Sequence, residues 1–74
     1  MTTLKQLTKQ HGQYKMRQVM YLSSLYELIE QTYDYEELAN KSRNDLRAMT
    51  REAYSKLEHR GYKIPQLRAR RAIR

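Results

Sequence analysis

The residues best suited to chemistry in this chain are cationic and amide side chains near its middle. Arg43, Arg47 and Arg51 recur at intervals of four residues, and Asn44 follows the first of them. Four-residue spacing places side chains next to one another on one flank of a helix. Guanidinium groups bind phosphate and the edge of guanine, and an amide suits the edge of adenine. The pattern therefore predicts contact with nucleic acid, with Arg47 and Asn44 reading bases.

The chain shows no pattern of residues that indicates catalysis. It has no Cys, and its two histidines, His11 and His59, are far apart with no third ligand at metal spacing. Gly-rich phosphate loops and nucleophile motifs are also absent from the sequence. A chain of 74 residues buries a thin core that leaves little room for a substrate pocket. We therefore expect a protein that is not an enzyme and that uses no metal and no cofactor.

Positive charge is concentrated at the two ends of the sequence. Residues 1–18 and residues 67–74 each carry four basic side chains and no acidic one. Residues 19–66 carry seven basic and eight acidic side chains, so the net charge of +7 comes from the ends. Basic blocks of this kind often contact phosphate. The charge predicts an anionic partner, although solubilising tails are the simpler explanation.

The pattern of apolar residues predicts helices. Gly12, Gly61 and Pro65 are the only Gly and Pro residues, and no segment alternates like a strand. Apolar residues recur every three or four positions over residues 13–31 and again from Leu46 to Leu57. We therefore expect an all-α protein, a small three- to four-helix bundle of helix-turn-helix type.

Capping residues set the expected ends of these helices. Asp34 with Glu37 predicts a short helix over about 35–41, and Ser42 with Asp45 predicts a longer helix that runs to about residue 60. Gly61 suits the left-handed position that ends a helix. We expect a basic N-terminal arm or short helix over residues 1–12, a helical domain over 13–64 and an Arg-rich C-terminal tail over 65–74.

Two segments together resemble a known family of regulators. The short helix contains Glu37-Leu38-Ala39, and the longer one continues as Thr50-Arg51-Glu52-Ala53-Tyr54-Ser55-Lys56-Leu57-Glu58-His59-Arg60-Gly61-Tyr62. Residues 19–64 resemble the helix-turn-helix core of GntR-like winged-helix bacterial transcription regulators. Thr50 stands where that family has Val, and Pro65 and the Arg-rich end stand where it has a wing, so the wing is missing or reduced. The resemblance implies a DNA-binding transcription regulator that acts as a dimer.

The sequence therefore predicts two sets of site residues. The residues expected to contact nucleic acid are basic or amide side chains: Lys41, Arg43, Asn44, Arg47, Arg51, Lys63, Arg68, Arg70 and Arg71. The residues expected to contact a protein partner are tyrosines, which supply every aromatic ring of the chain: Tyr21, Tyr33, Tyr35 and Tyr62.

The sequence is compatible with three functions. The first is a duplex-DNA regulator, with a homodimer expected because one recognition helix gives little affinity. The second is a small phage- or plasmid-type adaptor that binds a larger protein through the tyrosines. The third is a structured-RNA or ribosome-associated protein whose Arg-rich end orders on RNA.

No apolar run approaches the ~20 residues needed to span a bilayer, so we expect a cytoplasmic protein without a membrane partner.

Overall fold

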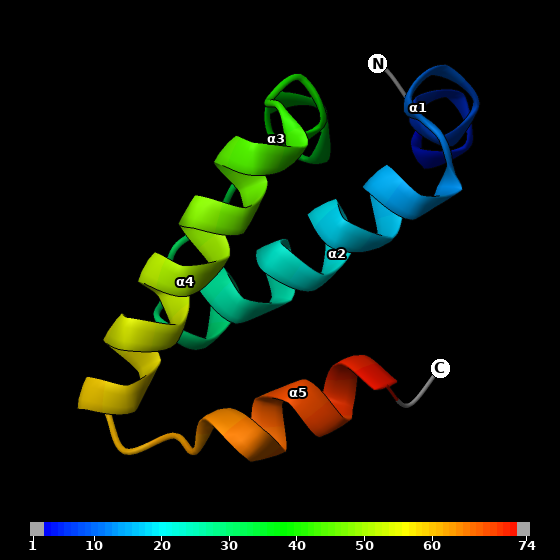
Figure 1. Ribbon diagram of the computed structural model, residues 1–74. Coiled ribbons are helices and arrows are strands. Elements are labelled where there is room, and N and C mark those ends of the chain that lie inside the picture. The colour runs from blue at the N-terminus through cyan, green and yellow to red at the C-terminus, as the bar shows by residue number, and fades with distance from the viewer. Residues whose placement is uncertain (1–2, 73–74) are drawn as a thin grey trace.

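Five helices make up the described part of the chain in a computed structural model (Figure 1). The structure describes the backbone of residues 3–72 and the side chains of residues 3–68. The helices are α1 (Leu4–His11), α2 (Gln13–Leu28), α3 (Tyr35–Ala39), α4 (Arg43–His59) and α5 (Ile64–Ala72). The expected all-α class is confirmed, although the described residues form five helices rather than three or four. None of these helices is long and apolar enough to cross a membrane.

Helix α2 is the centre of the packing. It crosses α4 and also contacts α1 and α3, while α5 turns back along its other side (Figure 1). Its apolar stripe meets the stripe of α4, so that Leu22, Leu46 and Leu57 are fully buried. Leu38 and Ala39 of α3 are equally buried, and the small Ala39 permits close approach of the short helix. Burial of a large aliphatic side chain contributes about 1.5–3 kcal/mol, so this shared core holds α4 firmly on α2.

The two ends of the chain form helices that contact the core. Helix α1 has Thr3 as its N-cap, with a reciprocal capping box to Gln6, and it buries Leu7. Helix α5 begins at Ile64, and Leu67 is buried. The expected boundary between a domain ending at residue 64 and a tail starting at residue 65 therefore falls inside α5. Pro65 is compatible with this start, because the first turn of a helix does not use its backbone N–H groups.

The end of α2 differs from the expectation. The apolar pattern predicts a helix to residue 31, but α2 ends at Leu28 because Glu30 adopts a left-handed backbone with φ 61°. The Gln31 amide then donates to the Tyr26 carbonyl at 2.9 Å, and the Glu30 amide donates to the Glu27 carbonyl at 3.1 Å. These two bonds form a Schellman motif, which usually has Gly at the left-handed position. Glutamate gives no sequence signal for this turn.

The expected ends of α3 and α4 agree better with the structure. Ser42 is the N-cap of α4, and its hydroxyl accepts the Asp45 amide at 3.1 Å. Gly61 follows α4 with φ 97°, as the sequence predicts. Asp34 is the N-cap of α3, but its side chain makes no capping bond, so the capping box expected with Glu37 is absent.

Candidate nucleic-acid interface

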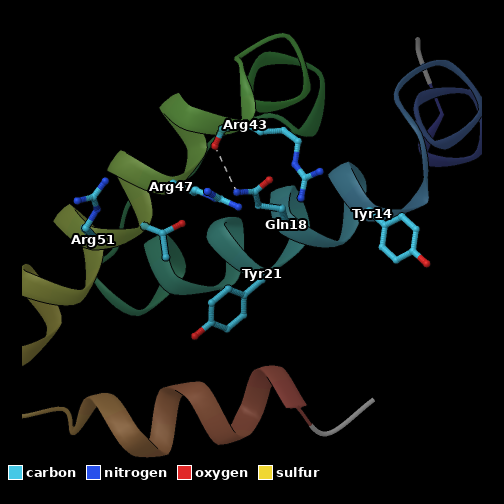
Figure 2. Close-up of a pocket in the computed structure, with 7 residues that line it drawn as sticks. Tyr14, Gln18, Tyr21, Arg43, Arg47 and Arg51 are labelled. Carbon is cyan, nitrogen blue, oxygen red and sulfur yellow. Dashed lines mark hydrogen bonds between the residues drawn. The ribbon is translucent and has the colours of Figure 1, made fainter.

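A groove of about 440 Å³ lies between α2 and α4 (Figure 2). One wall is formed by α4 and the other by three residues of α2 that stand one or two turns apart. The lining residues are Tyr14, Gln18, Tyr21, Arg43, Arg47, Thr50 and Arg51. None of them is acidic. The crossing of the two helices therefore brings the predicted arginines into one concave surface.

The three arginines carry charge that no acidic side chain neutralises within the described residues. Arg43, Arg47 and Arg51 are all exposed, and none of them forms an ion pair there. The ion pair that α4 does form joins Lys56 to Glu52 at 3.4 Å, on the flank of the helix away from the groove. The three guanidinium groups are therefore available to an anion from outside.

The α2 wall offers an aromatic ring and an amide. Tyr14 is 76% exposed, so its ring is open to solvent. Gln18 is half-buried, and its Nε2 donates to the Arg43 backbone carbonyl at 3.5 Å. This bond is long, and it turns the Oε1 of Gln18 away from that carbonyl. Oε1 is buried and has no hydrogen-bond partner.

A tyrosine cluster closes one end of the groove. The Tyr21 hydroxyl lies 2.6 Å from the Tyr54 hydroxyl and donates to the Leu67 carbonyl at 3.0 Å. The two rings meet edge to face with centroids 6.4 Å apart. The Arg68 guanidinium carbon lies 6.0 Å from the centroid of the Tyr54 ring. This contact places the positive charge of Arg68 beside the cluster, close to the end of the groove.

Four of the other residues predicted to contact nucleic acid are described by the structure, and they do not line the groove. Asn44 is exposed on the first turn of α4, on the face that points away from the core. Lys41 is half-buried in the link between α3 and α4, and Lys63 is exposed between α4 and α5. The predictions for Arg70 and Arg71 fall on side chains that lie outside the described residues. The structure thus gathers three of the nine predicted residues in the groove, with Arg68 close to its end.

The four tyrosines predicted as a protein interface do not form one surface. Tyr21 is half-buried with its hydroxyl bonded inside the protein, and the Tyr33 ring packs against Tyr26 with centroids 4.6 Å apart. Tyr35 and Tyr62 are exposed, but Tyr35 stands at the start of α3 and Tyr62 follows the far end of α4. Two of the four therefore serve packing within the fold.

Sequence reasoning missed Tyr14, Gln18 and Thr50 as lining residues. Tyr14, Gln18 and Tyr21 share one flank of α2 because they stand four and three residues apart. That spacing is a usable signal for a common flank. It does not show that the flank faces the arginines, since this depends on how α2 and α4 cross.

The remaining chemistry of the described residues is limited. No group of three or more His, Asp or Glu side chains among them could hold a metal ion. Burial raises the pKa of the Tyr26 hydroxyl, and the nearby Tyr33 and Glu52 raise it further.

No protein-family model, curated protein or solved structure matches this chain. The groove and the surface around it are therefore the features that bear on function.

Proposed function

We propose that this protein is a small nucleic-acid-binding protein that acts as a DNA-binding transcription regulator. In this proposal α3 and α4 work as a helix-turn-helix, and α4 enters the major groove of duplex DNA. The observation that carries the proposal is the set of three exposed guanidinium groups on α4 without an acidic partner in the described residues.

The outward face of α4 suits close approach to a duplex. Its exposed positions include Asn44, Ala48, Arg51 and Ser55, which lie within about one third of the helix circumference. Ala48 and Ser55 are small, so the helix backbone can come near the base edges. Asn44 at the start of α4 can then contact adenine, and Arg47 can contact guanine. Bases are commonly read by the N-terminal half of a recognition helix, where both residues stand.

Phosphate contacts come from the basic residues around this face. Arg43 and Arg51 flank the readers along α4, while Lys41 and Lys63 stand just before and just after the helix. Such contacts supply affinity and orientation without sequence information. The exposed carboxylates of Glu36 and Glu37 on α3 repel phosphate, so the proposal places the duplex backbone on the α2 and α5 side of α4.

A homodimer is part of the proposal. A single recognition helix buries too little surface for high affinity, and two copies would read two half-sites one helical turn apart. Analytical ultracentrifugation with and without duplex measures this directly. If the saturated complex contains one copy of the protein per duplex, the homodimer is contradicted. The proposed contacts of α4 with DNA are tested separately.

Selection from a random duplex pool, followed by fluorescence anisotropy on the enriched site, tests the proposal. We expect the protein to prefer one duplex sequence. Arg47→Ala and Asn44→Ala should each reduce the discrimination in binding free energy at the base that the residue reads, by about 1–3 kcal/mol. Arg60→Ala is the matched control, because Arg60 is exposed at the far end of α4 and does not line the groove. Equal binding to every duplex would refute the recognition helix. Tighter binding to structured RNA at equal ionic strength would favour the RNA alternative.

A further inference from the structure

The amide of Gln18 presents a hydrogen-bond acceptor that the fold leaves unused. Its Nε2 donates to the Arg43 carbonyl at 3.5 Å, and in this orientation Oε1 points away from that carbonyl. Its Oε1 is buried among the groove side chains without a partner. A buried acceptor that lacks a donor destabilises a protein, so such an atom in a native fold calls for an explanation.

The side chains around this oxygen can move. Figure 2 shows the Gln18 amide between the side chains of Arg43 and Arg47. Both arginines are exposed and are attached to α4 by long flexible chains. An anion that draws their guanidinium groups outward therefore gives a ligand access to Oε1 without disturbing the core.

The groove is suited to a small ligand rather than to a duplex. Its volume of about 440 Å³ falls in the range of small-molecule sites. A duplex is too wide to enter the groove, and in our proposal the duplex contacts the outward face of α4 instead. The occupant of the groove is therefore a smaller unit than a base pair.

Three features of the groove together define the chemistry of that unit. Arg43, Arg47 and Arg51 require negative charge. The exposed ring of Tyr14 offers a flat face for stacking, and Oε1 of Gln18 accepts a hydrogen bond. A phosphodiester has charge but no ring and no donor. An unpaired nucleotide has all three, because its base exposes N–H groups that pairing would otherwise occupy.

We infer that the groove between α2 and α4 binds an unpaired nucleotide, with its phosphate on the arginines, its base against Tyr14 and a base N–H donated to Gln18. This site goes beyond the proposed duplex regulator, because it adds a second class of ligand. The nucleotide comes either from a single strand or from the free pool, and the two sources share this chemistry. Since both ligands use Arg43 and Arg47, an unpaired strand and a duplex compete.

Chemically modified oligonucleotides test the inference with the full-length protein. Anisotropy compares a labelled thymidine pentamer with the same pentamer made of N3-methylthymidine, which keeps the phosphates and the ring but lacks the N–H donor. We expect the methylated pentamer to bind more weakly on the order of fivefold, the loss typical of one hydrogen bond. A pentamer of abasic sites also lacks the stacked ring and binds more weakly still.

Variants of the α2 wall assign the effect to named residues. Gln18→Leu keeps the size of the side chain, and we expect it to bind both pentamers equally. Gln31→Leu is the matched control, because Gln31 is exposed outside the groove and should preserve the fivefold difference. Tyr14→Ala should weaken the binding of both pentamers on the order of tenfold. The Tyr14 side chain is largely exposed, so its removal leaves the core intact. Circular dichroism verifies the fold of each variant.

The outcomes separate this inference from the proposed function. Equal binding of the two thymidine pentamers by the wild-type protein overturns the inference, even if Gln18→Leu fails to fold. If the abasic pentamer binds as tightly as the thymidine pentamer, the groove contacts only phosphates, and the inference is again overturned. A sequence preference on duplex DNA is measured separately, so either result can fail alone. Titration with thymidine 5′-monophosphate distinguishes the sources: saturation at similar concentration points to the free nucleotide, and much weaker binding points to a strand.

Discussion

The hydroxyl of Tyr21 on α2 lies 2.6 Å from the hydroxyl of Tyr54 on α4 and also donates to the Leu67 carbonyl on α5 at 3.0 Å. Since Tyr21 has one hydroxyl proton and gives it to Leu67, Tyr54 must donate to Tyr21. One oxygen atom thus joins three helices. The same ring closes the end of the groove, so the position of α5 and the shape of the groove are linked.

Replacing Tyr21 by Phe tests this junction. The ring remains, but both hydrogen bonds are lost, and we expect the free energy of unfolding to fall by about 1–2 kcal/mol. Urea denaturation measures the change, and hydrogen exchange should show weaker protection of α5. Tyr14→Phe is the control with no expected change, since Tyr14 is largely exposed. Unchanged stability in Tyr21→Phe would show that Leu67 burial alone holds α5.

The two predicted N-caps should respond differently to alanine. Ser42 bonds the Asp45 amide, so Ser42→Ala is expected to lower the free energy of unfolding by about 1 kcal/mol. Asp34 makes no such bond, so Asp34→Ala should lower the free energy of unfolding by clearly less than Ser42→Ala does. Thermal unfolding of both variants under one condition gives the comparison. A larger loss in Asp34→Ala would reverse the order that the structure implies.

The turn after α4 is a second Schellman motif, because the Tyr62 amide donates to the Leu57 carbonyl and the Gly61 amide to the Glu58 carbonyl, both at 3.0 Å. The two motifs give opposite predictions. Glu30 holds a left-handed backbone that disfavours side chains, so Glu30→Gly should raise the free energy of unfolding by up to about 1 kcal/mol. Gly61 has φ 97°, and nothing stands within 4 Å of an added Cβ. Gly61→Ala should therefore destabilise by about 1 kcal/mol through backbone strain alone. Denaturant titration measures whether the free energy of unfolding rises or falls in each variant. A Gly61→Ala variant more stable than the wild type would contradict the turn geometry.

Stability should fall at alkaline pH because of Tyr26. Burial, Tyr33 and Glu52 raise its pKa above the ordinary value of 10.0. The folded state therefore keeps the phenol proton at a pH where the unfolded state has released it, so the free energy of unfolding decreases as the pH rises above about 10. Absorbance of tyrosinate and circular dichroism follow the transition together. Tyr26→Phe should lessen this decrease, and an unchanged pH profile in that variant would contradict the role of Tyr26.

The salt dependence of duplex binding should report each phosphate contact. Removing one contact lowers the magnitude of the slope of log K against log salt by about 1. We expect this decrease for Arg43→Ala and for Arg51→Ala. Lys56→Ala is the control, because Lys56 pairs with Glu52 away from the groove. Equal slopes for all three variants would place the bound DNA on another surface.

Much of the fold and part of the site follow from the sequence. The three- and four-residue spacing of apolar side chains determines which face of α2 and α4 is buried. Ser42 and Gly61 determine where α4 begins and ends, because their local chemistry favours those positions in any context. The spacing of Arg43, Arg47 and Arg51 determines that they share one flank. These are local properties, and the sequence contains them in full.

Only the tertiary structure decided what stands opposite that flank. The crossing of α2 and α4 depends on how Leu22, Leu46 and Leu57 fit together, and it places Tyr14 and Gln18 across from the arginines. The left-handed Glu30 that follows α2 has no signal in the sequence, and the docking of α5 through Leu67 depends on a contact between distant segments. Packing energy outweighs local preference at these points, because burying one large side chain is worth more than one unfavourable backbone angle.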